Sequence, residues 1–414
     1  MGSRVAVHGD WLPRSIMGRA AALCAIVRML YISSVVIIGH VLAGLGVGSA
    51  HRRVDVVVLD GVSAPVPLFA LVGIPVVFYC HYPDKLLCTE RAGWLKRSYR
   101  IVIDTVEEAT TGCATIIVVN SSFTARAFHA SFPSLSGHFQ PQVLYPTIEE
   151  EEDGPLAATT LTTVCPAVIA YTAGFDHVLL SLNRYERKKN VGLALEAFAH
   201  AKRAASSARL LLVIAGGYDT RVLENVEHLR ELKQRADTLG LTHGDGDVAL
   251  GAATVDVVFR TSIPGAERSA LLARATALLY TPDNEHFGIV PLEAMYARTP
   301  VVAVASGGPL ETVVDGETGF LRPQDSAAFG DAILALMQPP TDAQRTALAR
   351  RLPQTTPPTQ LPRDVPLARL MGLAGRAHVQ VRRPGPYPPC ALPCHILTTL
   401  RRQTSRPERC ARPS

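Results

Sequence analysis

The chain has 414 residues, of which 48% are hydrophobic, and a formal net charge of +5. This length is sufficient for two domains, each with a hydrophobic core of its own. The small basic excess lies largely near the C-terminus and is not interleaved with aromatic residues, which excludes nucleic acid as an expected partner.

An apolar run from Met29 to Ala50 is the first distinctive segment, and His40 is its only side chain that ionises near neutral pH. Its length is near the roughly 20 residues that cross a bilayer as a helix. Arginines flank the run on both sides: Arg14, Arg19 and Arg28 before it, and Arg52 and Arg53 after it. Three interpretations stay open, namely a membrane-spanning helix, a helix lying in the membrane interface, and a buried helix of an α/β domain.

The rest of residues 1–148 alternates short β-branched runs with helical patterns. The runs indicate strands over residues 54–60, 74–80, 116–119 and 143–148. Asn120 or Ser121 is expected to cap the helix that follows the third strand. Because continuous apolar strands alternate with helices, we predict a parallel sheet covered on both faces, in an N-terminal Rossmann-like domain.

A second α/β series is predicted over residues 177–337. Residues 149–176 before it are first acidic, then contain Gly-Pro and then many threonines, which is typical of a linker. Strands are indicated at Leu179–Leu182, before Gly216-Gly217, at "DVVFRTSIP", at Ala277–Tyr280 and at "PVVAVASGG", with helices between them. This alternation predicts a doubly wound domain.

Residues 338–414 are rich in proline, threonine and arginine. We predict that they are largely disordered, with one helical segment, "LARLMGLAGRAHVQ". A histidine and three cysteines of this tail could be read as metal ligands: His395, Cys390, Cys394 and Cys410. Their spacing is not that of zinc sites, so no metal site is predicted. The eight cysteines of the chain show no regular spacing and do not predict a disulfide scaffold.

Two carboxylates of the second domain are candidate ligand-binding groups. Glu285 follows the strand Ala277–Tyr280, and Pro291 suits the first turn of the next helix, so Glu293 is expected in that first turn. Open α/β sheets bind ligands beyond the carboxyl ends of their strands. The segment "HFGIV" between the carboxylates offers backbone N–H groups before a helix, which suits an anion.

Three further loops of the second domain carry cations or glycines. "NRYERKKN" contains Arg184, Arg187, Lys188 and Lys189, "AGGYD" contains Gly216 and Gly217, and "SGGPLE" precedes a helix. Fixed cations suit a diphosphate whose charge grows as it departs, while carboxylates accept hydrogen bonds from ribose and sugar hydroxyls. The loops together favour a nucleotide diphosphate joined to a sugar. The alternative interpretation of the charge run "ERKK", taken alone, is a solvent-exposed surface with no ligand.

The first domain contributes His81 and Asp84, which follow a strand in "CHYPD". A histidine at a strand end is a candidate for stabilising a reaction centre or for contacting an acceptor. The alternative is a loop histidine that bonds to the backbone.

These motifs resemble those of a known family. The stretch from Glu285 to Glu293 resembles the E-x7-E motif of retaining GT-B glycosyltransferases, family 4. Arg184 and Lys189 resemble the arginine–lysine pair that binds the donor diphosphate there. The longer stretches "FYCHYPDKLL", "SLNRYERKKN" and "YTPDNEHFGIVPLEAMY" are similar to the α-1,3/1,6-mannosyltransferases of dolichol-linked oligosaccharide synthesis, and the likeness covers about residues 9 to 340.

The resemblance implies a GT-B fold, with two Rossmann-like domains facing a crevice, the first on the acceptor side and the second on the nucleotide-sugar side. It implies GDP-mannose as donor, with no tightly bound cofactor and no metal. It implies Man-GlcNAc2-diphosphodolichol as acceptor, extended by an α-1,3 and then an α-1,6 mannose at the cytosolic face of the endoplasmic reticulum. Other glycosyltransferases of N-glycan precursor synthesis are implied as partners. This location favours membrane contact for Met29–Ala50.

The resemblance also implies roles for single residues. Glu285 contacts the donor mannose, and Glu293 contacts the ribose. The backbone of Phe287, Gly288 and Ile289 approaches sugar and phosphate, with Arg184, Lys189, Gly216 and Gly217 also on the donor side. His81 lies near the anomeric centre, and the reaction proceeds with retention and without a covalent enzyme nucleophile, unlike retaining glycosidases.

Two departures from the family pattern lead to further expectations. The chain begins after the opening strand and glycine loop of the family, so the first domain is expected to be incomplete. "VRRPGPYPPCALPC" stands where the family has a C-terminal helix that crosses back onto the first domain. Two alternatives to an active mannosyltransferase stay open. One is a donor-binding but catalytically inactive form with an interaction role, and the other is a GT-B enzyme that uses another sugar.

Overall fold

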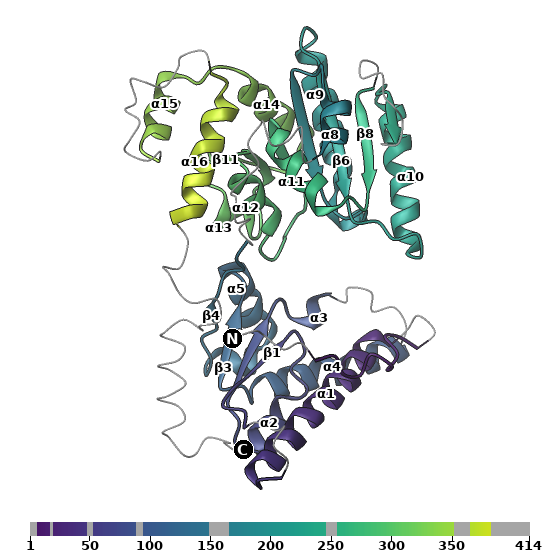
Figure 1. Ribbon diagram of the computed structural model, residues 1–414, viewed down its shortest axis with the longest axis vertical. Coiled ribbons are helices and arrows are strands. Elements are labelled where there is room, and N and C mark those ends of the chain that lie inside the picture. The colour runs from purple at the N-terminus through teal and green to yellow at the C-terminus, as the bar shows by residue number, and fades with distance from the viewer. Residues whose placement is uncertain are drawn as a thin grey trace. The chain divides into compact units, whose positions relative to one another are not determined.

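The computed structural model describes residues 6–16, 20–47, 53–87, 94–148, 165–245, 255–351 and 365–381. The chain divides into two compact units that separate between Tyr145 and Pro146, here called the first unit and the second unit. Each unit has a parallel sheet of its own (Figure 1). The prediction of two α/β units with parallel sheets is therefore confirmed.

The first unit has a four-stranded sheet in the order β1-β2-β3-β4, with every neighbouring pair parallel. Its strands are β1 (Val57–Asp60), β2 (Val76–Cys80), β3 (Ile116–Val119) and β4 (Gln142–Val143). The first three confirm the predicted strands. The fourth was predicted over residues 143–148 and is much shorter, because Pro146 has no N–H to continue the ladder.

In its described residues, the first unit has these helices around the sheet: α1 (Ala21–Gly44), α2 (Val66–Leu71), α3 (Asp84–Leu87), α4 (Trp94–Thr111), α5 (Ser122–Ser131) and α6 (Pro133–Ser136). Ser121 caps α5 as predicted, since its hydroxyl accepts a hydrogen bond from the N–H of Thr124 at 3.0 Å. Buried aliphatic and aromatic residues of the helices and strands form the core of the unit, among them Phe69, Phe78 and Phe128.

The apolar run predicted over Met29–Ala50 is shifted in the structure. Helix α1 begins earlier, because Ala21–Arg28 is rich in good helix formers, and it ends at Gly44. Gly46 follows with φ 72°, a left-handed conformation that stops a helix. Among the described residues, α1 is the one helix long and apolar enough to cross a membrane, judged by length and composition.

The second unit has a seven-stranded parallel sheet in the order β11-β10-β9-β5-β6-β8-β7. Its strands are β5 (His177–Leu182), β6 (Leu210–Gly216), β7 (His243–Asp245), β8 (Val257–Thr261), β9 (Ala277–Tyr280), β10 (Val301–Val304) and β11 (Gly319–Arg322). Alternate residues enter different cores: Leu211 and Val213 belong to one, and Leu212 and Ile214 to the other. The sheet is therefore covered on both faces, as predicted.

The helices of this unit divide between the two faces. One core includes residues of α9 (Val191–Ala204), α10 (Leu223–Thr238), α14 (Ser326–Met337) and α16 (Leu367–Val381). The other includes residues of α8 (Pro166–Thr172), α11 (Gly265–Arg274) and α12 (Ile289–Tyr296). The short helices α13 (Pro309–Thr312) and α15 (Asp342–Ala349) and a 3-10 turn at Arg187–Lys189 complete the unit.

Part of the segment predicted as a linker, residues 149–176, is a packed helix. Val168 and Tyr171 of α8 are buried in the core beside α11, and the Tyr171 hydroxyl bonds to Glu267 at 3.3 Å. Pro166 opens this helix at a position where its missing N–H costs nothing. The linker prediction is therefore wrong for Pro166–Thr172, because composition hid a short buried helix.

The region after Met337 also contains more structure than predicted. Helix α16 confirms the expected helical segment, but α15 was not predicted, although Thr341 and Gln344 form a capping box at its start. Helix α16 packs closely on the end of α12: a Cβ at Gly372 would lie 1.9 Å from the carbonyl oxygen of Arg298. The prediction of a largely disordered tail is therefore wrong for α15, whereas the helix expected within the tail is confirmed by α16.

Candidate active site

Four neighbouring strands of the second unit, in the order β10-β9-β5-β6, end in the loops that carry the predicted site residues. Glu285 follows β9, Lys189 follows β5, and Gly216 ends β6. Since the strands are parallel, all of these loops leave the same edge of the sheet.

Glu285 forms an ion pair with Lys189, whose Nζ donates to the Glu285 carboxylate. The two side chains are only 20% and 18% exposed. The backbone of Lys189 is also fixed, because the Thr281 hydroxyl donates to its carbonyl oxygen at 2.7 Å. Burial on its own would raise the pKa of Glu285, but the charge and hydrogen bond of Lys189 leave that pKa below its usual value. Glu285 is therefore a fixed carboxylate, charged at neutral pH.

Tyr280 lies beneath this pair at the end of β9. Burial, followed by the charge of Glu285 and its action as a hydrogen-bond acceptor, raises the pKa of Tyr280 well above its usual value. Gly288 approaches the same phenol: a Cβ there would lie 3.1 Å from the hydroxyl oxygen, and its φ is 78°. Tyr280 is a site residue that sequence analysis missed, because a buried tyrosine at the end of a strand looks like a core residue.

Glu293 lies in α12, and its position differs from the prediction. The helix begins at Ile289 after Gly288 in a left-handed conformation, so Pro291 lies in the first turn and Glu293 beyond it. The early start follows from Gly288, which turns the chain into the helix two residues before the proline. Glu293 is paired with Arg268 of α11, a partner that sequence analysis did not identify. Burial raises the pKa of Glu293 although Arg268 opposes this.

We expect Arg268→Gln to weaken donor binding most strongly at mildly acidic pH, where Glu293 of the variant is protonated and no longer accepts hydrogen bonds as a carboxylate. Without the guanidinium, the pKa of Glu293 rises further, and ionising it in a buried site becomes more costly. Because a raised folded-state pKa stabilises the folded state only below that pKa, the melting temperature should fall more steeply with rising pH than in the wild type. Arg268→Lys keeps the charge and should restore both properties. Equal pH profiles for Gln and Lys variants would contradict the role of Arg268.

The loop after β10 supports the backbone of Glu285. The N–H of Gly308 donates to the carbonyl oxygen of Glu285 at 2.7 Å, and the Ser306 hydroxyl accepts from the N–H of Asn284 at 2.9 Å. A Cβ at Gly308 would lie 2.1 Å from the carbonyl oxygen of Phe287. The glycines of "SGGPLE" therefore allow two loops to touch.

Gly216 also allows two loops to approach each other closely. Its φ is 151°, and a Cβ there would lie 1.9 Å from the carbonyl oxygen of Asn183. Arg184 lies beside Gly217 and is mostly exposed, 3.6 Å from Glu186. The cations predicted as one cluster point to different partners: Arg187 pairs with Glu227 and Glu231 of α10, and Lys188 with Glu186.

His81, in the first unit, bonds to a carboxylate. Its Nε2 lies 2.6 Å from Oδ1 of Asp60, which ends the neighbouring strand β1, and its ring packs edge-on against Tyr79. The ring is thus oriented by a side chain, where the alternative had been a bond to the backbone. Asp84, the other polar residue of that loop, bonds to Arg100 at 2.9 Å.

Glu107 of α4 bonds to the start of α3, which follows this loop: it accepts from the N–H groups of Asp84 at 2.7 Å and Lys85 at 3.2 Å. Burial raises the pKa of Glu107 to about 7. Its contribution to stability is therefore complete below its ordinary pKa of 4.5 and is lost as the pH rises through about 7.

We expect Glu107→Gln to remove this part of the pH dependence of the free energy of unfolding. Between the ordinary and the raised pKa of Glu107, this part amounts to on the order of 3 kcal/mol. The amide oxygen can still accept one of the two N–H groups, which bond to different carboxylate oxygens in Glu107, and the variant should gain relative stability as the pH rises. Unfolding of both proteins at pH 4.5, 6 and 8 gives the difference directly. Glu107→Ala removes the acceptor and should be less stable at every pH. A constant difference between Glu107→Gln and the wild type would contradict the assignment.

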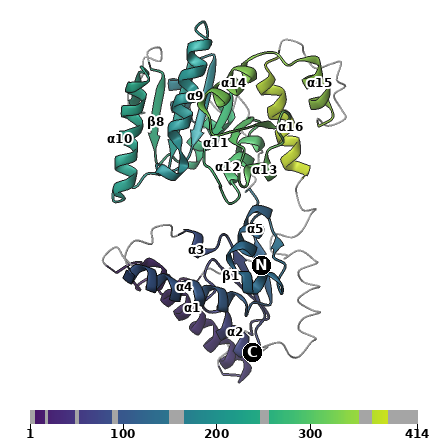
Figure 2. The same ribbon diagram turned by 180° about the vertical axis from the view of Figure 1, so that it is seen from behind.

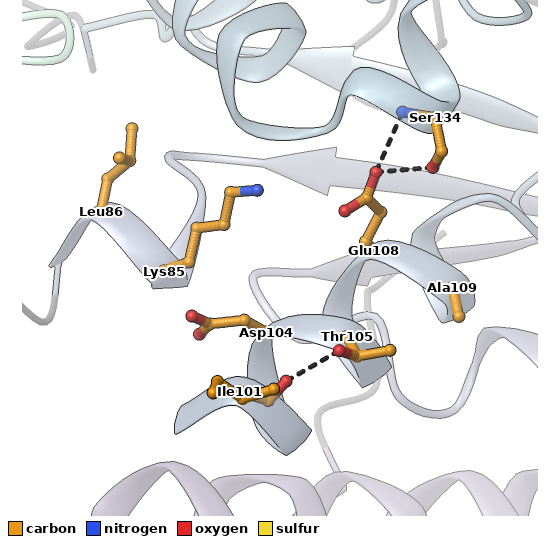
Figure 3. A pocket seen from close by; sticks show the side chains of 8 residues that line it. All are labelled: Lys85, Leu86, Ile101, Asp104, Thr105, Glu108, Ala109 and Ser134. Atoms are coloured by element: carbon orange, nitrogen blue, oxygen red, sulfur yellow. Dashed lines mark hydrogen bonds between the residues drawn. The ribbon is translucent and has the colours of Figure 1, made fainter. Parts of the chain in front are cut away.

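A surface pocket of about 610 Å³ lies between α3, α4 and α6 of the first unit (Figure 3). Glu108 points to Ser134 and accepts from its N–H at 3.1 Å and from its hydroxyl at 2.5 Å, so it caps α6. None of the predicted site residues lines it; the lining residues are Lys85, Leu86, Ile101, Asp104, Thr105, Glu108, Ala109 and Ser134. Cys390, Cys394, His395 and Cys410 lie outside the described residues.

Comparison with known proteins identifies the family. The family model for glycosyl transferases group 1 matches residues 173–351. The alpha-1,3/1,6-mannosyltransferase ALG2 of Homo sapiens is 44% identical over 350 residues, covering 83% of this chain and 77% of that protein. The corresponding protein of Rhizomucor pusillus is 44% identical over 342 residues, covering 80% of this chain and 71% of that protein.

Among solved structures, sucrose-phosphate synthase from Thermosynechococcus elongatus has a TM-score of 0.58 at 19% identity, covering 89% of this chain and 77% of that chain. At this identity the likeness concerns the fold alone, and it agrees with the predicted GT-B fold. With two α/β units, a group 1 glycosyltransferase match over the second of them, and relatives this similar over most of their length, the chain belongs to the ALG2 family of α-1,3/1,6-mannosyltransferases.

Proposed function

We propose that this chain transfers mannose from GDP-mannose to Man-GlcNAc2-diphosphodolichol, forming an α-1,3 and then an α-1,6 linkage with retention of configuration. The activity in the names of the relatives supports the linkages. The observation that carries the proposal is the ion pair of Lys189 and Glu285, two largely buried side chains at the edge of the sheet of the second unit. The proposed place is the cytosolic face of the endoplasmic reticulum membrane, beside other glycosyltransferases of the same synthesis.

In this proposal Lys189 and Arg184 bind the donor diphosphate. Negative charge grows on the diphosphate as the bond to the sugar breaks, and cations fixed before the reaction stabilise it without reorganisation. Lys189 suits this role because its backbone is tied to Thr281 and its side chain is partly buried. Arg184 is mostly exposed and rests beside the Gly216-Gly217 turn, from which it can reach a ligand at the strand ends.

The carboxylates bind hydroxyl groups. Glu285, charged at neutral pH, accepts hydrogen bonds from the mannose, and Glu293 accepts them from the ribose. The backbone of Phe287, Gly288 and Ile289 approaches sugar and phosphate at the start of α12, and a helix N-terminus favours an anion. His81, held by Asp60, acts near the anomeric centre. The departing phosphate assists attack by the acceptor on the same face of the sugar.

The test is mannosyl transfer from GDP-mannose to a Man-GlcNAc2-diphosphate lipid by the full chain in membranes. We expect two successive mannose additions, and we expect Glu285→Ala to abolish them while Glu317→Ala does not. Glu317 is the matched control, because it is also a partly buried carboxylate paired with a basic side chain, in this case Arg351. Donor binding without transfer would instead support the inactive, interacting form. Transfer from UDP-sugars in preference to GDP-mannose would overturn the proposed donor.

A further inference from the structure

The loop from Asn183 to Asn190 carries both cations that the proposed function assigns to the donor diphosphate, and we call it the cation loop. Lys189, near its end, is fixed by Thr281, whose hydroxyl donates to the carbonyl oxygen of Lys189 at 2.7 Å. Arg184, near its start, has a side chain that is 73% exposed. The position of Arg184 therefore depends on how the backbone around it is held.

Tyr185, the residue after Arg184, is a buried anchor of the cation loop. It is only 1% exposed, and its hydroxyl oxygen lies 3.0 Å from the carbonyl oxygen of Ile214 and 3.1 Å from that of Arg260. Its N–H donates to the carbonyl oxygen of Gly217 at 3.1 Å. The carbonyl oxygen of Tyr185 accepts its hydrogen bond from a side chain of α10.

That side chain is Asn225, in the first turn of α10, which joins the loops that follow β5 and β6. Its Nδ2 donates to the carbonyl oxygen of Tyr185 at 3.0 Å, and its Oδ1 accepts from the N–H of Asp219 at 3.0 Å. Asn225 is 7% exposed, so water has little access to these bonds. Because one end of the amide donates and the other accepts, a carboxylate of the same shape could not make both bonds.

A second set of contacts between α10 and the cation loop lies nearer the surface. The N–H of Arg187 donates to the Glu224 carboxylate at 3.1 Å. The Arg187 guanidinium pairs with Glu227 at 3.0 Å and with Glu231 at 2.6 Å. Helix α10 itself runs beside β8, as Figure 1 and, from behind, Figure 2 show. Exposed ion pairs contribute little one by one, whereas a buried polar group that loses its partner is costly, so Asn225 is the stronger connection.

We propose that Asn225 is a positioning residue for donor binding: it fixes the backbone of Tyr185 and thereby holds Arg184 in place for the diphosphate. The inference rests on the proposed function, which assigns the diphosphate to Arg184. A Cβ at Gly217 would lie 3.4 Å from Cγ of Arg184, so the start of that side chain rests on the glycine turn. Asn225 ties the loop of Arg184 and the loop of this turn to the same helix, and so fixes one against the other.

The test is a titration of the full chain with GDP, in which the wild type is compared with Asn225→Asp. The carboxylate of the variant can still accept from the N–H of Asp219, but it sets an oxygen with no hydrogen against the carbonyl oxygen of Tyr185. We expect the dissociation constant for GDP to rise about tenfold, because a small displacement of a binding group is enough for such a loss. Asn225→Ser adds no charge and leaves room for a bridging water, so it should raise the constant about threefold.

Steady-state mannosyl transfer separates positioning from a general loss of folded protein. With Asn225→Asp, the KM for GDP-mannose should rise by about the same factor as the dissociation constant for GDP, and the KM for the lipid acceptor should stay unchanged. A variant that is only less folded would lower kcat and leave both KM values as they are.

Thr299→Val is the matched control for a buried hydrogen bond. Thr299 is 1% exposed, and its hydroxyl donates to the carbonyl oxygen of Leu272. It precedes β10 and therefore lies at the opposite end of the strands from the loops of the site. Its loss should lower the melting temperature without changing the dissociation constant for GDP.

A double-mutant cycle tests whether Asn225 acts through Arg184. Once Arg184→Ala has removed the positioned group, adding Asn225→Asp should weaken GDP binding no further. The melting temperature of the double variant should still fall below that of Arg184→Ala, because the bond to Tyr185 is lost in both backgrounds.

Two results would overturn this inference and leave the proposed function intact. One is GDP binding by folded Asn225→Asp equal to that of the wild type, although Arg184→Ala weakens it. The other is an equal loss from Asn225→Asp with and without Arg184. If Arg184→Ala leaves GDP binding unchanged, the proposed role of Arg184 fails, and the inference fails with it. Binding of UDP in place of GDP would overturn the proposed donor alone, and the same variants titrated with UDP would then test Asn225.

Discussion

Lys189→Ala is expected to lower kcat/KM for the donor by about 100-fold or more, the loss typical for removal of one fixed group that stabilises developing charge. The substitution has two effects. It removes the cation proposed to bind the diphosphate, and it leaves Glu285 partly buried without its ion-pair partner. The pKa of Glu285 should then rise, since burial is no longer opposed by the ammonium. Steady-state transfer kinetics with varied GDP-mannose measure the effect.

The control for Lys189→Ala is Lys202→Ala. Lys202 also forms an ion pair with a carboxylate, that of Asp256, but it lies at the end of α9 and away from the strand-end loops. It should retain near wild-type transfer. In a double-mutant cycle, Lys189→Ala with Glu285→Gln should lose less than the sum of the two single losses, because the residues act as a pair. Strict additivity, or equal kinetics for the two lysine variants, would show that the pair is not part of the site.

Gly308→Ala is expected to cause the largest loss that does not remove a functional side chain. The added Cβ would lie 2.1 Å from the carbonyl oxygen of Phe287 and 2.4 Å from its Cα, so one of the two loops has to shift. A shift of this kind typically costs about 1–3 kcal/mol of folding stability. It also moves the backbone of Glu285, whose carbonyl oxygen accepts from the N–H of Gly308. We therefore expect a lower melting temperature together with a loss of transfer.

Gly265→Ala provides the matched comparison. Gly265 also stands at the start of a helix, α11, but nothing lies within 4 Å of the position where its Cβ would be built. Alanine there should be neutral or stabilising by about 0.5–1 kcal/mol, because it restricts the unfolded chain. The two glycine variants should thus change the melting temperature in opposite directions. A melting temperature for Gly308→Ala equal to that of the wild type would contradict the contact between the loops.

The sequence predicted the elements that depend on continuous apolar runs. β9 and β10 are short and apolar, and β5 is apolar apart from His177 and Ser181. Their order along the chain already placed Lys189 and Glu285 at strand ends. The fold could be predicted to this extent because burial on both faces of a parallel sheet imposes such runs. Helices α8 and α15 were missed, because each is short and lies among prolines and threonines that dominate the composition.

The partners of the site residues could not be predicted in the same way. Arg268 comes from α11 and Tyr280 from β9, and their meeting with Glu293 and Glu285 depends on how helices pack on the sheet. The structure gives two of the loop glycines a packing role that the sequence did not predict. The space beside Gly216 and Gly308 is filled by the backbone of neighbouring loops, while the donor-side role of Gly216 and Gly217 stays a prediction. Close approach of two backbones and close approach of a ligand leave the same pattern in a sequence.

The contact between α16 and α12 determines where a fragment of this protein can be cut. Glu293 lies in α12, and the end of that helix rests on α16 through Gly372, Gly375 and a hydrogen bond from Arg376 to the carbonyl oxygen of Tyr296 at 2.8 Å. An expression fragment of the second unit that stops after Met337 or Arg351 would leave apolar residues such as Met295 uncovered. A fragment that begins before α8 and extends through Val381 keeps both ends of the core, and it is the piece to make for crystallisation with a nucleotide.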